Sequence, residues 1–422
     1  MTSTKINKRP GTGKAADRYE ARLLWTGNRG LYALLQAARQ TGPIARVPRL
    51  GWVVTDPVLA RRVLNDHAHF GMAGEGGVGH LWTQLFGPEM AQFFGGARHA
   101  ELRTRARDLF TEDSARTLVE RSQGAHYRAM GARLAAGETV DVADATRVLA
   151  GRLVADLLGL PGERHANGSH TNGSHTNGSH PNDGSTDDSY RRVFAAGERL
   201  AGLAMGTTAS THLPPDVIDE ARTVVDEITV GVDEAYRTAG PDTILGRCRE
   251  MGLGLPLTRG LTTLLAIAGT ETGASGTSRT VALLHDTGQQ ELLLADPALM
   301  ANAVREGLRV ATPAPVIGRH VNRDVTVGGR DLREGDRILL LTYLADNGAG
   351  PFDIRRDYVP ETRQLWFGAG RHLCLGAAVA RTQVTRMLET LLHEGRPYRI
   401  VSRQAARRVL VPTYASLEIT IG

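Results

Sequence analysis

Cysteine and aromatic residues are scarce in this 422-residue chain. Its 2 cysteines cannot build a disulfide framework, which excludes the small disulfide-rich class of secreted protein and favours a reducing compartment. Aromatic residues make up 5% of the chain, against 41% hydrophobic and 23% charged residues. This ordinary globular balance excludes a wholly disordered or fibrous protein, and 18 scattered prolines exclude a collagen-like one.

Long apolar runs are also missing. No stretch of about 18 consecutive apolar residues occurs, so we expect no transmembrane helix and no membrane partner. The chain opens with MTSTKINKRPGTGK, which lacks the apolar stretch of a secretory signal, and we therefore expect a cytoplasmic protein. The net charge of +5 is a mild excess, which indicates a basic patch or an acidic partner and does not predict nucleic-acid binding.

Helical periodicity dominates what is present. Apolar residues recur with helical spacing in eight regions: 17–40, 57–65, 100–160, 190–205, 216–236, 257–285, 297–310 and 375–393. Short strands are expected at 44–56, as a pair, then at 325–327, at 337–341 and at the C-terminus. We predict a disordered arm over 1–16 and a mainly α fold with a small β region over 17–422. Within it, the glycine-rich segment 68–97 is typical of a binding loop.

Residues 165–189 differ in kind from the rest of the chain. They begin with the repeat HANGSHTNGSHTNGSH, which has no apolar residue able to anchor it, so we predict a disordered insertion. A metal site is the weaker interpretation, because nothing fixes the geometry of the four evenly spaced histidines, His165, His170, His175 and His180.

The strongest chemical signal is the segment FGAGRHLCLG, from Phe367 to Gly376. Its cysteine, Cys374, lies in a glycine-punctuated loop that opens directly into a helix. Glycine lets a backbone pass close to a bulky planar ligand, and a helix N-terminus favours a thiolate over a thiol. A thiolate is a strong electron donor to iron. The alternative is that Cys374 is only a small buried hydrophobic residue.

This segment resembles the haem loop of the cytochrome P450 family, FxxGxxxCxG. Three further segments match that family in the order it requires. The first is AGTET, which includes Ala268, Glu271 and Thr272 in the long apolar helix. It is similar to the family's oxygen-activating turn, where the acid and the alcohol break the helix locally and deliver protons. An apolar pocket has no other source of the protons that this chemistry consumes.

The second match is EGLR, with Glu306 and Arg309. At a spacing of i,i+3 the two charges are neighbours on a helix. The resemblance implies that they are buried with a third partner, Arg356, and hold the loop beneath the haem. An exposed surface pair is the alternative.

The third match is HAELR, with His99 and Arg103 on one helix face. The resemblance assigns these two residues, together with Arg319 and His372, to the haem propionates, which need cationic or donor partners. A solvated surface charge is the alternative for each. The resemblance also places Phe367, Gly368, Cys374 and Gly376 around the cofactor, with Cys374 as the iron ligand.

The resemblance implies a single-domain P450 fold and a soluble, bacterial-type monooxygenase. Its cofactor would be haem b (iron protoporphyrin IX). It would activate O2 with electrons from NAD(P)H, supplied by a separate ferredoxin-type donor and its reductase. The substrate would be an apolar organic molecule, such as a secondary-metabolite intermediate, that is hydroxylated or epoxidised.

Oxidative coupling without oxygen insertion and a non-catalytic P450-like helper protein are the alternatives. Arginines near two of the motifs suggest a docking patch for an acidic ferredoxin: Arg98, Arg105, Arg107, Arg371, Arg381 and Arg386. The residues expected to line the substrate pocket are Leu81, Trp82, Leu85, Phe86, Leu265, Val316 and Ile317.

Overall fold

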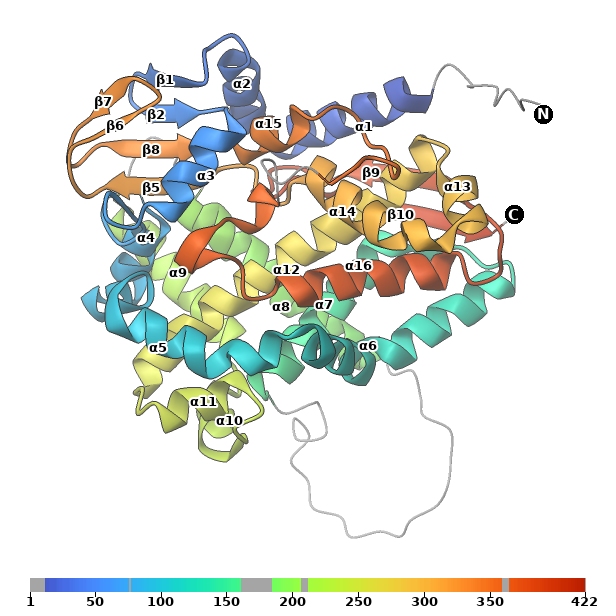
Figure 1. The fold of residues 1–422 in the computed structure, drawn as a ribbon. Coiled ribbons are helices and arrows are strands. Elements are labelled where there is room, and N and C mark those ends of the chain that lie inside the picture. The colour runs from blue at the N-terminus through green and yellow to red at the C-terminus, as the bar shows by residue number, and fades with distance from the viewer. Residues whose placement is uncertain (1–11, 76, 161–183, 206–211, 359–363, 422) are drawn as a thin grey trace, which may run out of the picture.

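A computed structural model describes residues 12–75, 77–160, 184–205, 212–358 and 364–421. Helices make up most of it and strands form only small sheets, so the predicted fold class is confirmed (Figure 1). None of the helices in these ranges is both long enough and apolar enough to cross a membrane.

Helix α12, Leu255–Asp286, runs through the centre of the molecule (Figure 1). Pro256 lies in its first turn, where the missing N–H of proline costs no hydrogen bond. Small and apolar residues occupy all sides of this helix, and most of its residues are buried. A helix that is buried on all sides belongs to the core of a large domain. It contacts α7 (Val142–Leu158), α8 (Gly184–Met205), α14 (Met300–Ala311) and α16 (Ala377–Leu391).

The other helices surround this core. Those before α12 are α1 (Thr12–Gly27), α2 (Arg29–Ala38), α3 (Pro57–Asn65), α4 (Val78–Phe86), α5 (Gly96–Ala106), α6 (Glu112–Ala135), α9 (Pro215–Ile228), α10 (Val232–Thr238) and α11 (Ile244–Glu250). After it come α13 (Gln290–Ala295) and α15 (Thr342–Asn347). Short 3-10 helices are η1 (Pro88–Phe93), η2 (Arg107–Phe110), η4 (Pro297–Leu299), η6 (Leu365–Phe367) and η7 (Gly370–His372).

The larger sheet has the strand order β1-β2-β8-β5-β3. β1 (Ile44–Val47) and β2 (Gly51–Val54) form the predicted antiparallel pair, and β2 continues in parallel with β8 (Arg337–Leu340). β5 (Ile317–Val321) and the two-residue β3 (Phe70–Gly71) complete the sheet. Because β5 lies inside this sheet, the Arg319 backbone is fixed against β8, opposite Ile338.

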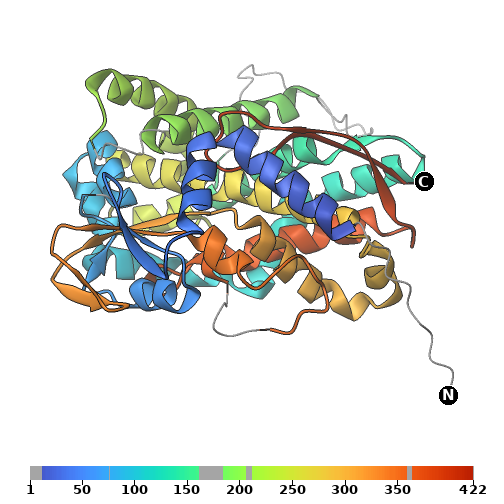
Figure 2. The same ribbon diagram turned by 90° about the horizontal axis from the view of Figure 1, so that it is seen from above.

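A second sheet has the order β4-β10-β9, and it lies away from the first along the molecule (Figures 1 and 2). β9 (Tyr398–Ala405) and β10 (Tyr414–Ile421) form an antiparallel hairpin, and the two-residue β4 (Val140–Asp141) pairs with β10. A third, two-stranded sheet joins β6 (Val325–Val327) to β7 (Arg330–Leu332).

Four expectations about local structure are corrected. Residues 12–16 of the predicted arm belong to α1, and 184–189 of the predicted insertion begin α8, because Asp187 pairs with Arg152 of α7 at 2.9 Å. The remainder of both segments, with the four spaced histidines, lies outside the described residues. The segment 68–97 is not an irregular loop: it contains β3, α4 and η1. The helices predicted at 17–40 and 216–236 are each two helices, and the first break is at Asn28, which caps α2.

Candidate active site

The loop of the FGAGRHLCLG segment is fixed by backbone contacts. The Cys374 amide donates a hydrogen bond of 2.9 Å to the Phe367 carbonyl. Gly370 has a φ of 63°, and a Cβ atom there would lie 2.6 Å from Cε1 of His67. Only glycine combines that backbone conformation with so close an approach. Gly376 then precedes α16, so the loop places Cys374 just before the N-terminus of this helix.

Cys374 combines exposed surface with a desolvated thiol. The residue is exposed, yet burial raises the pKa of its thiol. The backbone N–H of Gly376 and the charges of Arg103 and Arg381 act in the opposite direction and lower this pKa. The net direction for the free thiol is upward, because desolvation outweighs these contributions.

Six basic side chains gather beside this loop. The rings of His99 and His372 are 4.5 Å apart, and the backbone N–H of Arg371 donates to Nε2 of His67 at 3.1 Å. None of the six forms an ion pair with a carboxylate within the described ranges. The group consists of His67, His99, Arg103, Arg319, Arg371 and His372.

The basic cluster suppresses its own positive charge. Burial, then the neighbouring Arg103 and Arg371, lower the pKa of His99 to about 4. Burial, then His99 and the arginines, lower the pKa of His372 to about 3. Burial and Arg371 lower even the pKa of Arg319 to about 10. A cluster in this state would gain stability from a bound anion.

The AGTET segment lies in the middle of α12. Ala268 is exposed although the helix around it is buried, so this face of α12 borders open space. The helix is continuous here, since α12 extends from Leu255 to Asp286, and the Thr272 hydroxyl donates to the Ala268 carbonyl one turn earlier at 2.6 Å. The local break expected from the resemblance is therefore absent.

Glu271 is buried, and its Oε1 has no hydrogen-bond partner among the described residues. Burial, with a contribution from Glu198, raises the pKa of Glu271 to about 8. Glu198 lies on α8, where its neighbour Gly197 approaches Thr270 of α12 (a Cβ atom there would be 3.7 Å from Oγ1). Glu198 is partly exposed, and burial raises its pKa as well. Two carboxyl groups therefore lie on contacting helices, with Glu271 buried on α12 and Glu198 partly exposed on α8.

That cavity has a volume of about 470 Å³ and brings together distant parts of the chain. It is mostly apolar, and Glu271 lines it together with Ala268, Thr272 and Arg319. Four of the seven predicted substrate-lining residues also line it: Leu81, Trp82, Val316 and Ile317.

The other three predicted lining residues do not border this cavity. Leu85 is buried in the main core, and Leu265 packs against the same core. Phe86 ends α4 against α12, where a Cβ atom on Gly260 would lie 3.0 Å from the Phe86 ring. The end of α4 thus serves helix packing, and only its first two turns reach the cavity.

The segment EGLR forms a buried ion network. Arg309 donates to both carboxylate oxygens of Glu306 at 2.8 Å, and Arg356 donates to Glu306 from the far side at 3.0 Å. Arg309 also donates to the carbonyl groups of Asp346, Gly350 and Pro351. The structure thus brings together the three residues that the sequence grouped, and this network ties α14 to the segment that follows α15.

The remaining site residues surround the cysteine loop. Arg103 donates to the Leu373 carbonyl, so it holds the loop as well as facing Cys374. The guanidinium of Arg381 lies over the Phe367 ring, 5.9 Å from its centroid. Gly368 has a φ of 71° and sets the turn after Phe367.

These residues fit a haem. A haem carries two carboxylates on a flat apolar ring, and it needs buried donors beside a space bounded by a cysteine. Nε2 of His372 is buried and has no partner in the described part of the chain. Arg319 is 4% exposed, and the one side-chain hydrogen bond the structure gives it goes to the carbonyl of Gly318 at 2.8 Å. Cys374 has exposed surface, and Ala268 lines an apolar cavity.

Three residues of the site were not predicted from the sequence as site residues: His67, Glu198 and Arg371. Arg371 is inside the cysteine segment and could have been included by proximity. His67 and Glu198 are in no motif, and only tertiary contacts between distant segments identify them.

Residues 259–396 match the family model described as Cytochrome P450. Cytochrome P450-SU2 of Streptomyces griseolus is 37% identical over 137 residues, which is 31% of this chain and 33% of that protein. The chain therefore aligns with about a third of the length of the curated relatives it matches.

Two solved structures share the fold over nearly the whole chain. P450BioI, in complex with an acyl carrier protein that bears hexadec-9Z-enoic acid, has a TM-score of 0.71 at 21% identity and covers 93% of this chain and 98% of its own. A mutant of P450 EryK with erythromycin B has a TM-score of 0.72 at 21% identity and covers 98% of both chains. The sequence match covers α12, α14 and the cysteine loop, and the fold of solved P450 structures covers at least 93% of the chain, so this chain is similar to cytochrome P450 proteins in both respects.

Proposed function

We propose that the chain is a haem-thiolate monooxygenase that activates O2 to oxidise an apolar organic substrate. One observation carries this proposal. A single, mostly apolar cavity is lined by Glu271 and Thr272 of α12 and by Arg319 of the basic cluster. Such a cavity can hold an apolar molecule beside a group able to supply protons.

The residues that would hold haem b are those around the cysteine loop. Cys374 would bind its iron, and His99, Arg103, Arg319 and His372 would take its carboxylates. When bound, the cofactor supplies an iron centre that activates dioxygen. The Glu306 network acts from a distance by fixing residues 350–356, which follow α15.

Glu271 is the proton-holding group of the cavity. With a pKa near 8 it is protonated at neutral pH, and its unpartnered Oε1 is the atom free to hold that proton. Glu198 is the group nearer to solvent, so it can reprotonate Glu271 after each transfer. Thr272 lines the same cavity one residue further along the chain, and its hydroxyl must release the Ala268 carbonyl before it can donate toward the substrate.

Oxygen insertion by hydroxylation or epoxidation is the favoured reaction, and oxidative coupling or cyclisation is the second candidate. A non-catalytic helper has less support, because the cysteine and the acid and alcohol pair are all present around the site. The neighbours of this fold bind molecules as different as erythromycin B and an acyl carrier protein, so the fold does not select a substrate. A secondary-metabolite intermediate agrees with the apolar lining.

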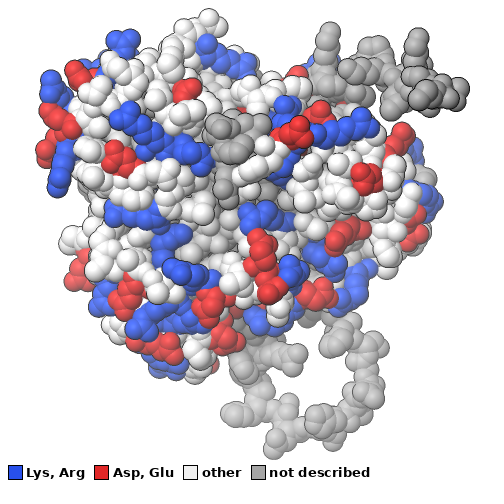
Figure 3. Space-filling view, in the orientation of Figure 1, with Lys and Arg blue, Asp and Glu red and all other residues white. Residues whose placement is uncertain are grey.

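The electron donor we propose is a ferredoxin-type protein with its own NAD(P)H-dependent reductase. The arginines expected to form its docking patch are mostly neutralised. Arg98 and Arg105 share Glu101, Arg381 pairs with Glu112, and Arg386 pairs with Glu120 and Glu389. Figure 3 shows basic and acidic side chains interspersed on this face. Arg107 and Arg371, which have no carboxylate partner within the described ranges, are the charges left to attract an acidic donor.

The test is reconstitution with haem, followed by turnover with a reductase and a ferredoxin on a panel of polyketide, peptide and terpene substrates. We expect the long-wavelength Soret band of the reduced carbonyl complex and a product heavier than its substrate by one oxygen atom. Loss of two hydrogens without gain of oxygen would assign the coupling reaction instead. A protein that binds no haem would overturn both.

A further inference from the structure

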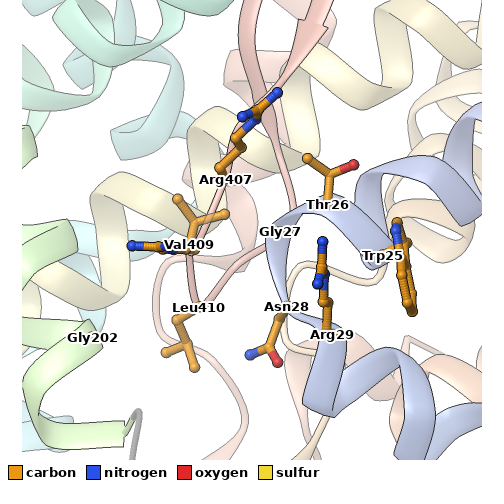
Figure 4. A pocket seen from close by; sticks show the side chains of 10 residues that line it. Trp25, Thr26, Gly27, Asn28, Arg29, Gly202, Arg407, Val409 and Leu410 are labelled. Carbon is orange, nitrogen blue, oxygen red and sulfur yellow. The ribbon is translucent and has the colours of Figure 1, made fainter.

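A second pocket opens where the first two helices meet the C-terminal hairpin. It has a volume of about 670 Å³. Figure 4 shows Trp25, Thr26, Asn28 and Arg29 on the α1–α2 side and Arg407, Val409 and Leu410 on the hairpin side. The two sides are joined by a hydrogen bond of 3.1 Å from the Val409 amide to the Gly27 carbonyl.

The charge of this pocket is of one sign. Arg29, Arg407 and Arg408 line it, and no carboxylate does. All three are exposed, and none forms an ion pair among the residues that the structure describes. Arg403 on β9, four residues before Arg407, differs because it forms an ion pair with Asp286 at 2.6 Å. Arg407 and Arg408, at the tip of the hairpin, therefore have no carboxylate partner among the described residues, whereas the charge of Arg403 is balanced by Asp286.

The pocket adjoins the substrate cavity. Asn28 and Leu410 line both spaces, and Ala201 of the cavity is followed in α8 by Gly202 of the pocket. The two spaces are therefore adjacent, and a molecule long enough to occupy both would have its ends in the apolar cavity and near the arginines. The Trp25 side chain, 47% exposed, has Arg29 over its ring at 5.0 Å and adds an apolar surface at that end.

We propose that this pocket binds the anionic end of the substrate, a carboxylate or a phosphate ester, while the apolar part lies in the cavity beside Thr272. The proposal rests on the proposed function for the reaction and adds the substrate class: an amphiphile with one anionic terminus. Positive charges at a wet pocket mouth raise affinity modestly, and their effect weakens as salt rises.

The experiment measures binding to the haem-loaded protein by calorimetry, with dodecanoate and dodecan-1-ol as matched probes. The variants are Arg29→Gln, Arg407→Gln and Arg408→Asn. Asparagine is used at 408 because the backbone there has a φ of 56°, a conformation that asparagine tolerates. Each variant should weaken dodecanoate binding about fivefold, since an exposed ion pair contributes roughly 1 kcal/mol, and should leave dodecan-1-ol unchanged.

Arg399→Gln is the control, because Arg399 is an exposed arginine of β9 that does not line the pocket. S-dodecanoyl-4′-phosphopantetheine distinguishes the two sources of negative charge: tighter binding than dodecanoate, lost in the same variants, would assign a phosphate ester. Equal affinity of the wild type for acid and alcohol, or equal effects of Arg399→Gln and the pocket variants, would overturn the proposal. Failure of the proposed function is seen separately, as absence of the reduced carbonyl Soret band.

Discussion

Replacing Glu306 by alanine should destabilise the protein more than any surface substitution. Glu306 is 1% exposed and accepts two hydrogen bonds from Arg309, one from Arg356 and one from the Asp353 amide. Its removal leaves the Arg309 guanidinium, 3% exposed, without a counter-charge. Breaking a buried pair in this way costs about 3–5 kcal/mol. We expect the lower end, about 3 kcal/mol, because Arg309 keeps its three backbone carbonyl acceptors.

The assay is urea unfolding of the haem-loaded protein, followed by circular dichroism and by haem absorbance. The control is Arg199→Ala. Arg199 of α8 also donates two hydrogen bonds to one carboxylate, that of Glu227 on α9, but both side chains of this pair are about half exposed. That variant should lose less than about 1 kcal/mol. A double replacement of Glu306 and Arg309 by leucine and methionine should recover part of the loss, because the most deeply buried charge is removed with its partner, while Arg356 also loses Glu306 but is 25% exposed and can reach solvent. Equal losses for Glu306→Ala and Arg199→Ala would refute the reasoning.

Four further outcomes follow from the site. Thr272→Ala should divert reducing equivalents from product to peroxide, measured as peroxide per NAD(P)H consumed; unchanged coupling would assign the proton to another group. Because burial raises the pKa of Glu271 from 4.5 to about 8, the folded state retains a proton that the unfolded state releases, and stability falls as pH rises between those values. Glu271→Gln should therefore gain stability relative to wild type between pH 5 and pH 8 in urea unfolding, and an equal difference at both pH values would contradict the assignment. Deletion of residues 165–183, which lack side chains able to pack, should leave haem content unchanged in the absorbance spectrum, whereas loss of haem would show that the segment packs. Reduction by an acidic ferredoxin should slow only modestly with salt, and charge reversal at Arg107 or Arg371 should slow it more than reversal at the paired Arg381.

Sequence reasoning identified the elements whose signals are local. The long apolar helix predicted at 257–285 is α12, and the proline-led helix at 57–65 is α3 with the same bounds. The contact of Glu306 with Arg309 and Arg356 was also predicted, although 47 residues separate the two arginines. That prediction was possible because the order of the motifs matched a family pattern.

What the sequence did not predict depends on tertiary contacts. Leu85 and Phe86 carry the same apolar signal as Leu81, and only the packing of α4 on Gly260 separates core from cavity. The arginine patch was expected from positive charge alone, and two of the four glutamates that neutralise it, Glu112 and Glu120, come from another segment, α6. Glu198 and Glu271 lie on two different helices, α8 and α12, and the first raises the pKa of the second. No spacing of residues along the sequence predicts such an interaction.

The central claim is that Cys374 binds the haem iron, and the reduced carbonyl spectrum tests it most directly. The chain has a second cysteine as a matched control: Cys248 is fully buried, and burial raises the pKa of its thiol to about 12. We predict that Cys374→Ala abolishes the long-wavelength Soret band of the reduced carbonyl complex and that Cys248→Ala retains it. A Cys374→Ala protein that keeps the band would contradict the account.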